Sequence, residues 1–179
     1  MRTNDIFSKD ILCNIITDNL DILRQCINGT IYQQWTAVIL LMQFIEYLLK
    51  YKIQSAGKRF RRIHEIKELY CDLTDRDRNA IEKIFTKLMK GRKIRDPKSF
   101  NSIKEFARRY NTAYKCYWRY DILINSESDQ GFFYLADTVT VLRSLIESTD
   151  LEIDLPSIVN EDKLAQKILK DGVRWGYVP

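Results

Sequence analysis

The single histidine of this 179-residue chain lies at the end of a strongly basic loop. Four cations stand within the six residues before His64: Lys58, Arg59, Arg61 and Arg62. An imidazole can accept or donate a proton near neutral pH, and a guanidinium group matches the geometry of phosphate oxygens. These residue types predict acid/base chemistry on a phosphate ester, with His64 and Arg59 as candidate catalytic residues and the other three as phosphate-binding residues. The alternative is a structural His64 that caps a helix or forms a hydrogen bond and is kept neutral by the neighbouring cations.

A predominantly apolar helix leads into this loop. Within residues 35–49 only Thr36, Gln43 and Glu46 are polar, so the helix is expected to be buried on most sides. These three residues and Lys50 recur at spacings of seven, three and four, which places them on one line of the helix. Glu46 and Lys50 are correctly spaced for an ion pair. The line is either the solvated edge of a central helix or a polar motif with a role of its own.

The basic loop belongs to a longer basic stretch in the middle of the chain. Residues 50–120 carry 21 basic and 8 acidic side chains, a net charge of +13, while residues 1–49 carry 3 and 5 and residues 121–179 carry 5 and 11. A helix is predicted from residue 101 or 102 to about residue 120. Its candidate phosphate-binding residues are Lys104, Arg108, Arg109, Lys115 and Arg119. Such a charge concentration favours a polyanion such as RNA as the partner, although a solvated helix face would produce the same count.

Helical periodicity dominates the rest of the chain, and the alternation typical of strands is nearly absent. We expect helices over residues 4–27 and 31–52, joined by a three-residue connection into an antiparallel hairpin. One apolar line is predicted on the first of these helices, at Leu12, Ile16, Leu20, Leu23 and Ile27. The remaining helices are predicted over residues 63–71, from a Thr74 cap to about 90, over 131–148, and from an Asn160 cap to about 170. The fold class is therefore all-α, in a chain of the length of one domain.

The composition argues against several classes of function. The four cysteines are widely spaced and the histidine is alone, so neither a zinc site nor any other metal centre is predicted. Glycine-rich phosphate and dinucleotide motifs are missing, and no cofactor is expected. Because the sequence has no apolar run long enough for a membrane span and no hydrophobic leader, we expect a cytoplasmic protein that does not act at membranes.

Two segments around the basic loop resemble the HEPN domain family. QFIEYLLK and HEIKELYCDL match a helix of the form Gln-x-x-Glu-x-x-x-Lys, followed by a glycine-containing loop and a His-acid-hydrophobic motif. The segment 118–148 is similar to the Arg-Tyr stretch and last long helix of that family, with Arg119, Tyr120, Ala136 and Asp137 in matching places. The resemblance covers about residues 4–148, and it marks four structural motif residues: Gln43, Glu46, Lys50 and Tyr120.

The resemblance implies a HEPN-like antiparallel bundle with a long helical hairpin over residues 1–148 and an extra C-terminal helix in residues 149–179, packed on the same domain. It further implies binding of RNA or a nucleotide in a prokaryotic toxin–antitoxin or phage-defence system. Homodimerisation or a nucleotidyltransferase partner is also implied. The broad apolar circumference of the second helix favours a dimer independently.

Two other functions stay open. The first is a metal-independent ribonuclease in which His64 acts on the ribose 2′-hydroxyl and nearby arginines stabilise the phosphate. Nuclease members of the family carry a late arginine followed four to six residues later by histidine, and no histidine follows His64 here. Arg59 precedes His64 with four residues between them, but this pair lies in the loop, not at the late position. The second is a regulatory module whose basic face docks an acidic protein.

Overall fold

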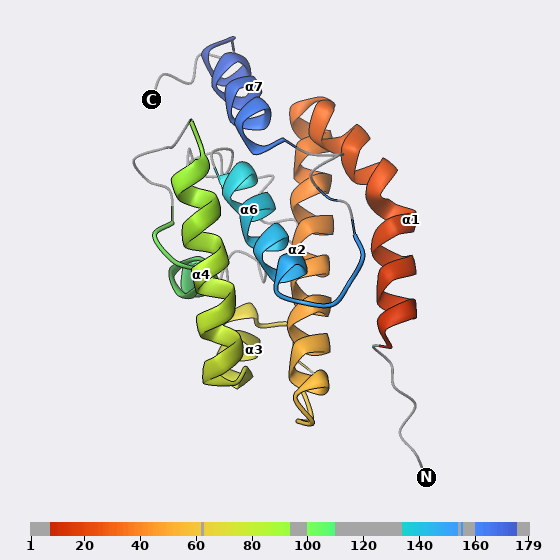
Figure 1. The fold of residues 1–179 in the computed structure, drawn as a ribbon. Helices are drawn as coiled ribbons and strands as arrows, with labels where there is room; N and C mark the ends of the chain where they lie inside the picture. Colours follow the sequence, from red (N-terminus) through yellow and green to blue (C-terminus); the bar gives the residue numbers. More distant parts are fainter. Residues whose placement is uncertain are drawn as a thin grey trace.

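The computed structural model describes residues 8–61, 63–93, 100–109, 134–153, 155 and 160–174. Six helices in it are labelled in Figure 1: α1 (Lys9–Asn28), α2 (Ile31–Ser55), α3 (Ile66–Asp72), α4 (Asp75–Gly91), α6 (Tyr134–Glu147) and α7 (Glu161–Arg174). Residues 103–109 are also helical, and no strand occurs in these ranges. The predicted all-α class is confirmed.

The helices α1 and α2 form the predicted antiparallel hairpin. The apolar line expected on the first helix is buried throughout, and it consists of Leu12, Ile16, Leu20, Leu23 and Ile27. Ser8 caps α1 through the amide of Ile11, and the residues before Ser8 that were predicted to be helical lie outside the described part. Thr30 and Gln33 form a reciprocal capping box at the start of α2. The short connection therefore stops one helix and starts the next.

Helix α2 extends three residues beyond its predicted end, to Ser55. It then closes with Gly57 at a φ of 74°, while the Lys58 amide donates to the Ile53 carbonyl at 3.1 Å. A residue with a side chain rarely adopts this left-handed conformation, whereas glycine adopts it readily. Gly57 thus ends the helix and turns the chain into the basic loop.

The next two helices differ from prediction mainly at one boundary. Helix α3 begins at Ile66, so Ile63 and His64 lie in the non-helical stretch before it. Thr74 caps α4, as predicted, by accepting the Asp77 amide at 3.1 Å. Because α3 starts later, His64 is not constrained by a helix and can turn towards α2.

Helix α2 lies in the middle of the bundle, with α1 on one side and α3 and α6 on others (Figure 1). Helix α6 packs in turn against α4 and α7. The apolar side chains of α2 are buried by these neighbours: Ala37, Val38, Leu41, Met42, Phe44, Ile45, Leu48, Leu49 and Ile53. The breadth of this apolar surface is thus explained within one chain and does not require a second copy.

The C-terminal helix α7 packs against α6. Lys167 Nζ donates to the Gly29 carbonyl at 3.0 Å, which joins α7 to the turn between α1 and α2. Asn160 caps α7 through the Lys163 amide, as predicted, and the helix continues to Arg174. These contacts agree with an extension that packs on the bundle, while the division at residue 148 stays a prediction. No helix in the described ranges has the length and apolar character to cross a membrane.

Candidate functional site

A buried carboxylate on α2 is the centre of the candidate site. The Glu46 side chain is 3% exposed, and its Oε1 lies 2.6 Å from Lys50 Nζ, one helical turn further along. The predicted ion pair is confirmed, but it lies inside the molecule and not on a solvated edge. Charges removed from water need a close partner of opposite sign, which each of these two residues supplies to the other.

His64 meets the same carboxylate from the loop. Its Nδ1 lies 3.0 Å from Glu46 Oε1 and 3.2 Å from Oε2, across 18 positions of sequence. Beside the Lys50 ammonium Glu46 is a carboxylate, which only accepts hydrogen bonds, so Nδ1 carries the proton and donates it. The imidazole is 69% exposed although its partner is buried. The Glu46 cluster, defined as Glu46, Lys50 and His64, thus joins a buried charge pair to a solvent-facing imidazole.

An aromatic ring completes the surroundings of the lysine. Lys50 Nζ lies 5.7 Å from the centroid of the Phe60 ring, and Phe60 is partly buried against the core. A cation over a ring face gains further electrostatic stabilisation. The contact of Phe60 with Lys50 was not predicted, because an aromatic residue within a basic loop gives no sign of which side chain it will contact.

The arrangement of the cluster suits proton transfer. A carboxylate that holds Nδ1–H fixes the tautomer in which Nε2 is the basic nitrogen, and it stabilises the imidazolium that forms when Nε2 takes a proton. In the described ranges no group of three or more His, Cys, Asp or Glu side chains could hold a metal ion. Glu46, Lys50 and His64 can provide acid/base chemistry through the exposed imidazole.

Two cations of the loop, Arg61 and Lys58, form hydrogen bonds to α3. Arg61 donates through Nε to Asp72 Oδ2 at 2.7 Å and through Nη2 to Glu68 Oε2 at 3.1 Å. Lys58 Nζ donates to the Asp72 carbonyl at 3.1 Å. Both side chains therefore anchor the loop to α3: the Arg61 charge is paired with two carboxylates, whereas the Lys58 ammonium bonds to a neutral carbonyl and has further N–H donors.

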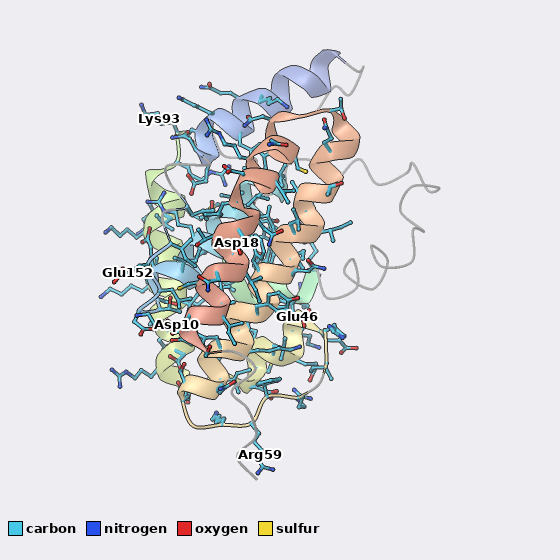
Figure 2. All side chains as sticks on the ribbon, turned by 90° about the vertical axis from the view of Figure 1, so that its right-hand side faces the viewer. Asp10, Asp18, Glu46, Arg59, Lys93 and Glu152 are labelled. Atoms are coloured by element: carbon cyan, nitrogen blue, oxygen red, sulfur yellow. The ribbon has the colours of Figure 1, made fainter. Side chains whose placement is uncertain are left out.

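Two other loop arginines were predicted to meet a substrate. Arg59 is exposed and projects from the tip of the loop, away from Glu46 (Figure 2). The structure therefore does not bring Arg59 to the Glu46 cluster. Arg62 lies outside the described residues.

The predicted basic helix is described over residues 103–109, where Lys104, Arg108 and Arg109 are all exposed. Arg109 pairs with Glu105 at 2.9 Å and its guanidinium lies 4.9 Å from the Phe100 ring centroid. The remaining residues of the predicted ridge, Lys115 and Arg119, and the motif residue Tyr120 lie outside the described part. Gln43 is partly buried on α2, about one turn before Glu46.

Glu82 on α4 connects the two basic regions. Its carboxylate accepts the Ile103 and Lys104 amides at 3.1 and 3.0 Å, which caps the helix at 103–109, and it also accepts the Tyr70 hydroxyl of α3 at 2.7 Å. Burial, together with the bond to Glu82, raises the pKa of Tyr70 and keeps the hydroxyl protonated as a donor. The sequence gives no signal for Glu82, because a glutamate on an amphipathic helix carries no sign of its distant partners.

A second buried carboxylate lies in the bundle. Asp137 on α6 pairs with the Arg92 guanidinium after α4, and its Oδ2 accepts the Phe100 amide at 3.2 Å. The resemblance marked the position of Asp137 but not its partners. These bonds hold the segment after α4 against α6.

Comparisons with known proteins gave no relative. No protein-family model, no curated protein and no solved structure matched the chain.

Proposed function

We propose that this protein is a HEPN-like helical module that binds RNA or a nucleotide, with the Glu46 cluster as its functional centre. The observation that carries the proposal is the shared carboxylate: Glu46 lies between Lys50 and the exposed ring of His64, at 2.6 and 3.0 Å. All three residues lie in QFIEYLLK and HEIKELYCDL, the two segments around the basic loop that carry the resemblance. This arrangement links a buried ion pair to an exposed imidazole that a ligand can reach.

The nearby charges support a phosphate-containing ligand. Lys104 and Arg108 are exposed on a helix whose start is fixed to α4 by Glu82, and Tyr70 brings α3 to the same carboxylate. Helix α3, which follows the His64 loop, and the basic helix at residues 103–109 thus both form hydrogen bonds to Glu82 of α4. Contacts of this kind hold the backbone of RNA with little base preference, and their strength falls steeply with salt.

A second function is favoured by the orientation of His64. As a general base, Nε2 would take the proton of a ribose 2′-hydroxyl; the oxygen then bonds to the adjacent phosphorus and the bond to the 5′-oxygen breaks. A proton returned to the leaving oxygen completes the reaction, whose products are a 2′,3′-cyclic phosphate and a 5′-hydroxyl. Glu46 would hold the imidazolium between the two transfers. This proposal makes the protein a metal-independent ribonuclease.

One experiment tests both functions. Purified protein is incubated with end-labelled RNA in the presence of a chelator, its affinity is measured at several salt concentrations, and any new ends are mapped. Under the binding proposal, Lys104→Glu with Arg108→Glu lowers affinity at least about tenfold. Lys163→Glu, an exposed lysine on α7, is the matched control and has little effect on affinity.

The histidine separates the two functions. If the protein is a ribonuclease, the wild type leaves new RNA ends that carry the cyclic phosphate. The His64→Ala variant then loses cleavage but keeps binding. A binding module shows no cleavage to lose. Absence of any RNA or nucleotide binding at low salt, with circular dichroism unchanged, would count against both and leave the protein-docking function. The implied homodimer is tested on the same samples by light scattering over a range of concentrations.

A further inference from the structure

Helix α1 carries an exposed apolar line. In the described part of the chain the exposed large hydrophobic side chains are Ile11, Ile15 and Ile22, at 47%, 36% and 49% exposure. Their spacings of four and seven residues place them on one line of the helix, about 120° around from the line that packs on α2. Single exposed apolar residues are ordinary, but a set that gathers wholly on one line of one helix marks an interaction surface.

Carboxylates accompany this line. Asp18 is exposed between Ile15 and Ile22, and Asp10 and Asp21 lie exposed along one side of it. Figure 2 shows Asp10 and Asp18 on the side of α1 that faces the viewer. The positions of Ile11, Ile15, Asp18 and Ile22 alternate by four, three and four residues, which is the spacing of a seam between two packed helices.

The tertiary structure adds more negative charge beside α1. Lys9 Nζ pairs with Asp150 Oδ2 at 3.3 Å, and the Tyr51 hydroxyl donates to Asp150 Oδ1 at 2.9 Å. These bonds tie the loop after α6 to the start of α1 and bring the exposed Glu152 to the same face (Figure 2). Asp10, Asp18 and Asp21 of α1 and Glu152 of the loop after α6 thus contribute to one surface.

The same loop forms an apolar groove with an acidic border. The groove has a volume of about 490 Å³, and its lining combines Ile146, Leu151, Ile153 and Leu155 with Glu147, Glu152 and Arg143. The four apolar side chains of this groove are buried, and Glu147 at its border pairs with Arg143 at 2.7 Å.

A second copy of the chain fits this surface poorly. If two α1 helices paired in parallel, Asp18 would face its own copy; if they paired antiparallel about the middle of the line, Asp18 would face Ile15. Either geometry puts a carboxylate into an apolar seam without a cation, which costs free energy. The acidic residues alongside would repel each other as well.

We infer that the outer face of α1 docks a cationic amphipathic helix of a partner protein. Apolar side chains of that helix lie on Ile11, Ile15 and Ile22, and a lysine or arginine pairs with Asp18. The acidic residues of α1 and of the loop after α6 attract the flanking cations of the helix and exclude anionic partners. This surface is separate from the Glu46 cluster, so the inference does not depend on the proposed function.

The test uses the full chain and a designed helical peptide. The peptide is about 18 residues long, about 27 Å as a helix, with leucines at spacings of three and four and lysines on both sides of them. A second peptide has glutamate in place of every lysine. Fluorescence anisotropy should show binding of the lysine peptide and not of the glutamate peptide.

Three variants locate the binding. Asp18→Lys and Ile15→Ser should each weaken binding of the lysine peptide at least about tenfold. A peptide with one glutamate placed opposite residue 18 should restore binding to Asp18→Lys. The matched control is Asp75→Lys, the same charge change at an exposed residue of α4, and it should change affinity by less than about twofold.

Several results would overturn the inference. These are equal binding of the two peptides, equal weakening by Asp75→Lys and Asp18→Lys, or no binding of either peptide to the wild-type chain. Concentration-dependent self-association that Ile15→Ser abolishes would assign the surface to a second copy. Circular dichroism checks each variant, and Asp18→Lys, at an exposed position, tests the inference by itself if Ile15→Ser does not fold.

Discussion

Glu46 on α2 and Asp137 on α6 are both buried carboxylates with a cationic partner, and they differ in what closes the site. The Asp137 side chain is 1% exposed, and the buried Arg92 and the amide of Phe100 lie against it. Glu46 is nearly as buried, yet it meets His64, whose imidazole faces solvent. Burial and pairing alone therefore do not distinguish the two sites. The exposure of the third group does, because the exposed imidazole of His64 can exchange a proton with a ligand and the enclosed groups around Asp137 cannot.

The closed site should have the largest effect on stability. We expect Asp137→Ala to lower the free energy of unfolding by about 3–5 kcal/mol, because it leaves the buried Arg92 without its counter-charge. Within the described residues Arg92 Nε already lacks a hydrogen-bond partner, so the guanidinium depends on Asp137. Urea denaturation measures the loss. Glu147→Ala is the control on the same helix: it removes a partially exposed pair with Arg143 at 2.7 Å and should cost about 0–1 kcal/mol.

The open site should show a smaller loss. Glu46→Gln keeps the shape of the side chain but leaves Lys50 buried without an anion, and we expect a loss of about 3 kcal/mol, towards the low end for a broken buried pair, because His64 admits water to one side. The double variant Glu46→Gln, Lys50→Met removes the unpaired charge and should recover part of the loss. An additive, larger loss in the double variant would contradict the interpretation of a mutually dependent pair.

His64 belongs to the open site alone, and its substitution should affect function more than stability. Because its ring is mostly exposed, we expect His64→Ala to change the free energy of unfolding by about 0.5 kcal/mol or less. Thermal denaturation of the variant beside the wild type measures this. A loss of several kcal/mol would instead make His64 part of the packing, like Arg92 at the closed site.

The exposed carboxylate Asp150 should have the smallest effect, which is a change in how stability depends on pH. Hydrogen bonds from the Tyr51 hydroxyl and Lys9 lower the pKa of Asp150 below its ordinary value of 3.8. A lowered pKa adds stability that is present above the unfolded-state pKa and is lost as the pH falls through the folded-state pKa. We therefore expect Asp150→Asn to reduce the difference in stability between pH 7 and about pH 3 slightly. Urea denaturation at both pH values checks the sign, and an increased difference would contradict it.

Local rules predicted much of the fold. The line from Leu12 to Ile27 on α1, the Thr74 cap of α4 and the Asn160 cap of α7 were all confirmed, because each depends on residues within one or two helical turns. The start of α3 was predicted at Ile63, three residues too early, because the apolar spacing continues into the loop while the backbone is not yet helical. Helical periodicity shows which side chains share a face and does not show where hydrogen bonding begins.

The candidate site was predicted in part. The Glu46–Lys50 pair follows from its i,i+4 spacing alone, and the resemblance connected it with His64. That Glu46 holds the imidazole, and that Arg61 is occupied by Glu68 and Asp72, depends on how the loop folds back on α2 and α3. Counting cations predicted a phosphate-binding loop, but a count does not show which cations already have an acidic partner.

By itself the sequence determined the all-α class, the helical hairpin, the ion pair within α2 and the separation of basic and acidic segments along the chain. Each of these is a property of composition or of residues close in sequence. The tertiary structure decided the meeting of His64 with Glu46, the closure of Asp137 by Arg92 across 45 positions, and the contact of Asp150 with Lys9 at the start of α1. The physical reason is that an apolar face must be buried, yet many partners could bury it. Only the packing that buries all the faces together selects which distant polar groups become neighbours.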